Sequence, residues 1–469
     1  MRRSFLARLS PTRLLALAAL LLAGPAITPG HYPLRYEGIE GYQQFVGATS
    51  AAQIPTLSFT LPGDRFFDEI TYTIGPSSSL LRFVQTSTGI SKAVFHDRKL
   101  AAQIDENGAV ASDNGWRLKD LVTQEALITG RIAFMRASTE TLRGAHILVP
   151  GGWPVDLTFT PGGRLWKATI HGTDDAVFSP LTYGNVAGLK VVTDWDVGQK
   201  NTQAISAQVS QGPAPPSLSG PAWQWRTQQR TWTSSFVPYN SRPMMPIAVN
   251  GVSSECILDT GSAGLMLSGE LAVRAGVHNV GPALTSRSVG ESTASYGRAD
   301  VVAGPVELRS AVVVTGLPIP GDYAVCGYDF LASFLVRIVG HSASVVARPM
   351  SPPPCKADCV RVDTWARNAI ASMRIESFSD RGLIDTGADD PLVVDALLKY
   401  SGGVGTPVDC GSHTYVQRAL TIGTVAIGPT PACYASFDDS SYKAVVGAAL
   451  LAHYRLTLDL GDRMLWLAR

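Results

Sequence analysis

Apolar and polar residues alternate with a period of two along much of the first half of the chain. The alternation is clear over residues 67–74, 155–160 and 165–170, and Gly, Pro, Asn and Asp interrupt it between segments. Such alternation predicts half-buried antiparallel strands. Residues 117–128 have helical spacing instead. The pattern predicts a β-rich domain over residues 31–210, in which no cluster of acids, bases or nucleophiles indicates a function.

The second half of the chain contains one pattern twice. An apolar run ends at Asp259-Thr260-Gly261, and another ends at Asp385-Thr386-Gly387. An apolar pair followed by glycine comes 68 residues after Asp259, at Gly327, and 62 residues after Asp385, at Gly447. Matching order, spacing and residue types indicate an internal duplication.

Local signals place elements around each copy. Asn250-Gly251 predicts a tight hairpin turn before the first copy, and a turn over residues 379–382 is expected before the second. Ser268 can cap a short helix over residues 269–275 that ends at Gly276. Asp395 can cap a corresponding helix over residues 396–400.

The segments suggest a linear organisation. We expect a signal peptide (1–30), the β-rich domain (31–210), a Pro-rich linker (211–235), a first lobe (236–350), an interlobe linker (351–362) and a second lobe (363–469).

The N-terminus has the layout of a secretory signal, because arginines precede a short apolar run over residues 14–22. An uncleaved anchor, which would keep the protein near a membrane, is the alternative. We expect an exported protein, periplasmic or secreted. The 39 basic and 38 acidic residues nearly balance, so nothing indicates a nucleic-acid partner.

Six cysteines in an exported chain predict disulfides. Cys355 and Cys359 can close a small loop, and Cys410 and Cys433 flank a predicted hairpin. Cys256 and Cys326 then remain. Metal ligation is the rival interpretation, but a single Cys-x3-Cys without suitably spaced histidines does not support it.

Both repeats resemble the lobes of the pepsin and retropepsin clan of aspartic peptidases, in particular retropepsin-type domains of bacterial exported proteins. Residues 383–390 are similar to the motif of retroviral proteases. The resemblance covers residues 236–469. It implies a mainly β fold, with two β-barrel lobes forming a bilobal acid-protease fold. It also implies an aspartic endopeptidase that needs no cofactor or metal.

The resemblance assigns catalysis to Asp259 and Asp385, which would share one proton and activate a water, as aspartic proteases are known to do. Ser262 is expected to bond the outer oxygen of Asp259. Asp389 and Tyr296 are expected to bind substrate, with Tyr296 in a flap over residues 288–297. Asp389 and Asp390 as simple loop caps are an equal alternative. The residues expected to support the active loops are Thr260, Gly261, Ser262, Thr386, Gly387 and Ala388.

Other functions fit the same sequence. One is a non-catalytic envelope protein that binds peptides or lipoproteins on an acid-protease-like fold. Another is a carrier whose working part is the N-terminal domain. The lobes could also pair between chains, although the short link between them favours a monomer with intramolecular pairing. The expected partner is a protein or peptide substrate.

Overall fold

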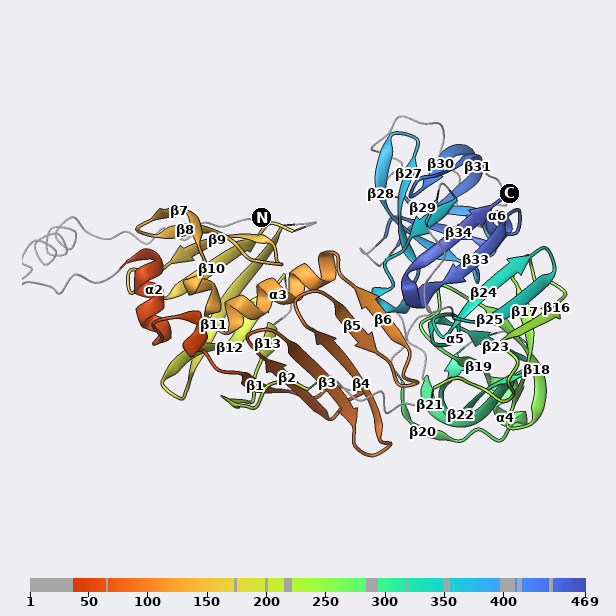
Figure 1. Ribbon diagram of the computed structural model, residues 1–469, viewed down its shortest axis with the longest axis horizontal. Coiled ribbons are helices and arrows are strands. Elements are labelled where there is room, and N and C mark those ends of the chain that lie inside the picture. Colours follow the sequence, from red (N-terminus) through yellow and green to blue (C-terminus); the bar gives the residue numbers. More distant parts are fainter. Residues whose placement is uncertain are drawn as a thin grey trace, which may run out of the picture.

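The computed structural model describes residues 37–64, 66–172, 175–198, 201–214, 222–283, 294–317, 321–348, 358–396, 416–437 and 442–469, with Ile319, Cys355, Lys356 and Cys410. These residues are mainly in β-strands, which confirms the predicted class (Figure 1). The expected signal peptide lies outside them. Within the described ranges, no helix has the length and apolarity needed to span a membrane.

The first fourteen strands form two antiparallel sheets of seven strands each. The first sheet has the order β14 (Ser206–Val209), β1 (Leu57–Leu61), β2 (Glu69–Ile74), β3 (Ser79–Gln85), β4 (Ile90–His96), β5 (Ala101–Ile104), β6 (Val110–Asp113). The second has the order β13 (Asn201–Gln203), β12 (Leu189–Val197), β11 (Ala176–Val186), β10 (Leu165–Ile170), β9 (Pro154–Phe159), β8 (Gly144–Leu148), β7 (Ala137–Thr141).

Two helices share a core with these sheets. They are α2 (Gly38–Val46) and α3 (Trp116–Ile128), and α3 lies close to the helix predicted over 117–128. Val122 and Leu127 of α3 are fully buried in one cluster with residues of both sheets. Short 3-10 turns are η1 (Ala51–Gln53), η2 (Arg131–Phe134), η4 (Trp365–Arg367) and η6 (Leu460–Asp462).

The first Asp-Thr-Gly copy lies in a six-stranded barrel, which closes because β21 pairs with β22. Its order is β17 (Met244–Val249), β18 (Val252–Leu258), β23 (Tyr323–Cys326), β19 (Met266–Ser268), β22 (Val306–Leu317), β21 (Ser295–Ala303). Two further strands extend its edges, β15 (Gln224–Trp225) and β20 (Asn279–Pro282).

The second copy lies in a barrel with the same strand order. This order is β27 (Ile370–Ile375), β28 (Phe378–Asp385), β32 (Ala444–Gly447), β29 (Leu392–Asp395), β31 (Val425–Ala435), β30 (Val416–Ile422). In both barrels the strand that leads into the motif pairs in parallel with the strand that runs up to the later glycine. The duplication seen in the sequence is therefore a duplication of topology.

A six-stranded sheet joins the two barrels. Its order is β16 (Thr231–Ser235), β25 (Ser342–Ala347), β24 (Phe334–Val339), β33 (Arg455–Asp459), β34 (Met464–Ala468), β26 (Cys359–Arg361). The central pair consists of β24 from the first repeat and β33 from the second, and Val336 lies opposite Leu458. The second half of the chain also contains three short helices, α4 (Gly269–Arg274), α5 (Tyr328–Leu331) and α6 (Ala448–Leu451).

Local predictions met different outcomes. Asn250 and Gly251 form the hairpin turn with positive φ angles of 47° and 81°, and Ser268 Oγ accepts a hydrogen bond from the Leu271 N–H to cap α4.

The turn expected over 379–382 is wrong, because those residues lie inside β28. The expected linkers contribute sheet strands, since β15 and β16 fall within 211–235 and β26 within 351–362. The helix expected over 396–400 lies almost wholly outside the described residues.

All six cysteines form disulfides, and the three pairs suggested by the spacing are confirmed: Cys256–Cys326, Cys355–Cys359 and Cys410–Cys433. The first pair links β18 to β23 directly beside the first Asp-Thr-Gly loop. Three disulfides indicate that the protein matures in an oxidising environment.

Candidate active site

Each Asp-Thr-Gly triplet forms a tight loop at the end of a barrel strand. Asp385 is the last residue of β28, and Asp259 directly follows β18. The N–H of Gly261 donates to Asp259 Oδ1 over 2.8 Å, and the N–H of Gly387 donates to Asp385 Oδ1 over the same distance. Each loop therefore orients its own carboxyl group in the same way.

The two threonines bind the loops to each other. The N–H of Thr260 donates to Thr386 Oγ1 over 3.1 Å, and the N–H of Thr386 donates to Thr260 Oγ1 over 3.0 Å. Each hydroxyl in turn donates to a carbonyl of the opposite lobe, Thr260 to Ile384 over 2.5 Å and Thr386 to Leu258 over 2.6 Å. Both side chains are buried, so these bonds are shielded from water and fix the spacing of the loops.

The carboxyl groups face each other across the junction of the barrels. A Cβ on Gly261 would lie 2.5 Å from Asp385 Cγ, and a Cβ on Gly387 would collide with the Asp259 carboxyl group. Glycine is therefore required after each threonine because the opposite carboxyl group occupies the space of a side chain. Asp259 and Asp385 are both half-buried.

This proximity changes the acidity of both groups. Burial, the negative charge of Asp385 and a hydrogen bond to it raise the pKa of Asp259 well above its usual value. Burial also raises the pKa of Asp385, while the hydrogen bond from Asp259 and the Gly387 N–H oppose that rise. Two adjacent carboxylates repel each other, so the pair favours a state in which the two groups share one proton.

Gly327 and Gly447 lie beneath these loops. A Cβ at Gly327 would come within 2.5 Å of the Ser262 carbonyl oxygen, and one at Gly447 within 2.8 Å of the Ala388 carbonyl oxygen. The residue after each glycine donates its N–H to the same carbonyls, over 2.8 Å from Tyr328 and 2.7 Å from Ala448. The later glycine of each repeat thus lets the motif loop pack closely against the backbone between β23 and α5 in the first repeat, and between β32 and α6 in the second.

Ser262 occupies a different place from the one its resemblance implied. Its hydroxyl donates to the Gly264 carbonyl over 3.2 Å and faces Met266 Sδ at 3.6 Å. The Ser262 hydroxyl therefore closes its own loop within the described structure, where a bond to the outer oxygen of Asp259 was expected.

Asp389 lies at the rim of the second loop and forms an ion pair with Arg242. Arg242 Nη2 donates to Asp389 Oδ2 over 2.8 Å, and its positive charge partly opposes the rise that burial causes in the pKa of Asp259 and Asp385. The sequence carries no signal for Arg242 as the partner of Asp389, because 147 residues separate the two.

Tyr296 is enclosed by the N-terminal domain. Its side chain is buried, and its hydroxyl donates to Glu106 Oε1 over 2.9 Å. Ile90, also from the N-terminal domain, shares a small apolar cluster with Ala283, Ala294 and Tyr296. The expected substrate contact of Tyr296 is therefore replaced by a domain contact. Residues 284–293, which include most of the expected flap, lie outside the described residues.

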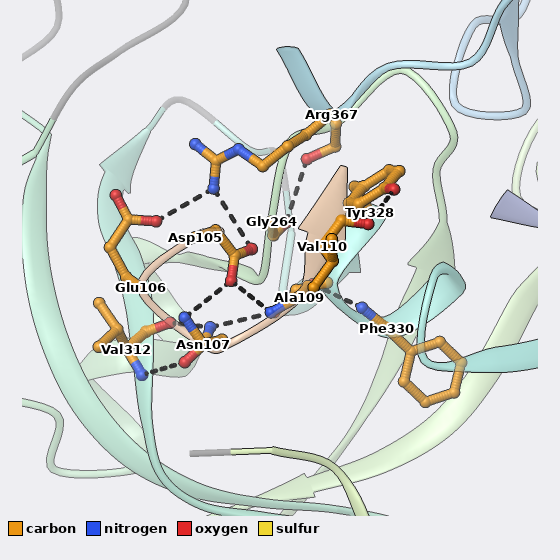
Figure 2. A network of polar contacts seen from close by, with 12 residues as sticks. Asp105, Glu106, Asn107, Ala109, Val110, Gly264, Val312, Tyr328, Phe330 and Arg367 are labelled. Carbon is orange, nitrogen blue, oxygen red and sulfur yellow. Dashed lines mark hydrogen bonds and ion pairs between the residues drawn. The ribbon is translucent and has the colours of Figure 1, made fainter. Parts of the chain in front are cut away.

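The β5–β6 hairpin carries the centre of this domain contact (Figure 2). Asn107 exchanges two hydrogen bonds with the backbone of Val312, over 2.7 and 2.8 Å, and its amide donates to Asp329 Oδ2. Arg367, just before the second barrel, contacts Asp105 at 3.4 Å and Glu106 at 3.0 Å. One hairpin tip thus joins the N-terminal domain to both repeats.

Comparisons with known proteins add little at the level of sequence. No protein-family model matches the chain, and no curated protein matches it. Among solved structures, it is similar to the aspartic proteinase from Irpex lacteus, with a TM-score of 0.35 and 11% identity. That match covers 51% of this chain and 97% of the other.

Proposed function

We propose that this protein is an aspartic endopeptidase, in which both lobes of one chain build a single active site on a bilobal acid-protease fold. The observation that carries the proposal is the pair of facing carboxyl groups, held by reciprocal threonine bonds between two barrels of identical strand order. Such a pair can activate water without a metal.

The two acids share one proton and act as a unit, since burial raises the pKa of both. The protonated carboxyl group of the pair donates its proton to the oxygen of the scissile carbonyl, and the ionised one takes a proton from the attacking water. The tetrahedral intermediate then collapses: its C–N bond breaks as a proton passes from the pair to the leaving amine nitrogen.

In this proposal Asp389, which pairs with Arg242 at the rim of the second loop, contacts the backbone of the substrate. In this proposal Thr260, Gly261, Thr386 and Gly387 hold the two loops against each other. Ser262 and Ala388 support their own loops, through the Gly264 carbonyl and the Ala448 N–H.

The test is hydrolysis of a denatured protein by the full chain between pH 3 and pH 8. Asp259→Asn and Asp385→Asn should each lower the rate by about a hundredfold or more, since each removes one acid–base group. Asp358→Asn, an exposed aspartate outside the site, is the matched control and should stay within about twofold. A statine-type inhibitor should compete with substrate.

A second candidate function is peptide binding without catalysis, and the same assay separates it from hydrolysis. If wild type and both dyad variants bind peptides equally well and none hydrolyses them, the fold serves as a non-catalytic binding module.

We also propose that the protein is exported. The basic and apolar residues within 1–30 and the three disulfides support this. Cell fractionation, with the disulfides of the fractionated protein assayed by thiol labelling, tests it. Recovery of the reduced protein in the cytoplasm would contradict export.

A further inference from the structure

The outer face of the second N-terminal sheet carries two histidines and an aspartate on neighbouring strands. His146 on β8 lies directly opposite Asp156 on β9. Thr169 on β10 lies opposite Asp156 from the other side. Side chains two residues apart along a strand share a face, so His171, just past β10, points to the same side as Thr169.

These side chains have no role in the core. The neighbouring residues Ala145, Val155 and Ile170 face inward and are buried. His146 and His171 are 32% and 35% exposed, and Asp156 is 53% exposed. The group is therefore reachable from solvent while its backbone is held rigidly by the antiparallel ladder.

Both imidazoles aim a nitrogen at one carboxylate. His146 Nδ1 lies 2.6 Å from Asp156 Oδ1, and His171 Nε2 lies 2.7 Å from Asp156 Oδ2. One ligand atom from each of the three residues lies within 4.8 Å of the others. Two imidazole nitrogens and a carboxylate oxygen are a donor set that suits Zn²⁺ and similar divalent transition metals.

A second acid orients one of these rings. Asp175 Oδ1 lies 3.3 Å from His171 Nδ1, the nitrogen that faces away from Asp156. If Nδ1 donates its proton to Asp175, the lone pair on Nε2 points toward the shared centre. A carboxylate behind a histidine is the usual partner of histidines that bind metals.

We propose that His146, Asp156 and His171 form a binding site for a divalent transition metal of the zinc type, with Asp175 as the positioning residue for His171. Tetrahedral Zn²⁺ with bonds of about 2.0–2.1 Å holds its ligand atoms roughly 3.3 Å apart. One ligand atom of each residue already lies within 4.8 Å of the others, and small rotations of these exposed side chains can bring them to this spacing. A water completes the coordination.

The other group of potential ligands does not carry such a site. Asp390, Cys410 and Cys433 also lie close together, but the two cysteines are joined in a disulfide and their sulfurs are not thiolates.

The experiment is calorimetric titration of the untagged, chelator-treated full chain with Zn²⁺. Wild type should bind one equivalent. His146→Gln, His171→Gln and Asp156→Asn should each weaken binding at least tenfold, and Asp175→Asn by about 10–100-fold. His453→Gln, an exposed histidine in the second lobe, is the matched control and should bind like wild type.

Thermal unfolding gives an independent readout. Zn²⁺ should raise the melting temperature of wild type and His453→Gln but not that of His146→Gln, because only a folded site binds the ion. The proposal is overturned if wild type does not bind Zn²⁺, or if wild type and both His→Gln variants bind it equally well. The site is independent of the peptidase proposal, so Asp259→Asn should bind Zn²⁺ normally.

Discussion

Tyr296 of the first lobe donates a hydrogen bond to Glu106 of the N-terminal domain, 190 residues earlier in the chain. Glu106 also accepts from Arg367, which precedes the second barrel. Glu106 is buried, and only 16% of the Arg367 side chain is exposed. One carboxylate therefore connects three parts of the molecule, through a residue of β21 at the end of the expected flap.

Removing the charge of Glu106 should destabilise this junction. Glu106→Gln leaves Arg367 with Asp105 alone as its ionic partner, and loss of one member of a buried ion pair costs about 3 kcal/mol. The measurement is the free energy of unfolding in urea. Glu69→Gln, an exposed glutamate on β2, is the matched control and should change it by less than about 0.5 kcal/mol. Equal stabilities of the two variants would show that the contact has no energetic role.

The threonine contacts should be essential for the dyad geometry. Thr260→Val keeps the shape of the side chain but leaves the Thr386 N–H and the Ile384 carbonyl without their partner. Two buried unsatisfied groups cost about 2–4 kcal/mol in unfolding free energy, and the proposed peptide hydrolysis should also fall. Thr260→Ser, which retains the hydroxyl, should recover most of both. Unfolding in urea and hydrolysis assays on the same preparations test this. If Thr260→Ser is as impaired as Thr260→Val, the methyl group and not the hydrogen bonds is responsible.

Much of the second half could be predicted from sequence, because its signals are local. The Asn250-Gly251 turn, the Ser268 cap and the Cys355–Cys359 disulfide each depend on residues close together in the chain. The duplicated triplets added a long-range prediction, since two similar segments fold alike.

The prediction at Gly382 was wrong because glycine occurs for two different structural reasons. Gly382 favoured a turn over residues 379–382, yet the true hairpin turn is at residues 376–377, where Glu376 takes a φ of 55°. A Cβ at Gly382 would overlap Met373 of the neighbouring strand, so this glycine serves close packing within a sheet. The sequence does not distinguish these two uses of glycine.

Contacts between distant segments had no sequence signal. Glu106, Arg242 and Arg367 are ordinary charged residues until the fold brings them to Tyr296 and Asp389. His146, Asp156 and His171 likewise lie 10 and 15 residues apart, which is not the spacing of a known metal motif. Only the register of three adjacent strands brings them together.

The disulfide beside the first active loop should contribute more stability than the smallest one. Cys256–Cys326 closes a loop with a sequence separation of 70, and Cys355–Cys359 one with a separation of 4. Loop-closure entropy predicts a loss of about 4 kcal/mol for the double Ala variant of the first pair and about 2 kcal/mol for that of the second. Urea unfolding without reductant measures both. A larger loss for the Cys355–Cys359 variant would contradict this order.

The junction between the domains should be more stable in acid than at neutral pH. Burial raises the pKa of Asp105 to about 7, with Glu106 and Asp329 adding to the rise and Arg367 opposing it. Burial also raises the pKa of Asp329 to about 6, against the hydrogen bonds from the Phe330 N–H and the Asn107 amide. In the unfolded chain both groups titrate near pH 4. At these two groups the folded state therefore binds protons more tightly, so their contribution to stability is largest below about pH 4 and is lost as the pH rises through 6 and 7.

The pH dependence of stability at the domain junction can be separated from that of the Asp259/Asp385 pair. In an Asp259→Asn background, the free energy of unfolding should decrease by on the order of 2–4 kcal/mol between pH 4 and pH 8. Adding Asp105→Asn should flatten that slope, whereas adding the exposed control Asp358→Asn should leave it unchanged. The comparison uses slopes, because Asp105→Asn also weakens the contact with Arg367 and shifts stability at every pH. A slope unaltered by Asp105→Asn would place the titrating groups elsewhere in the molecule.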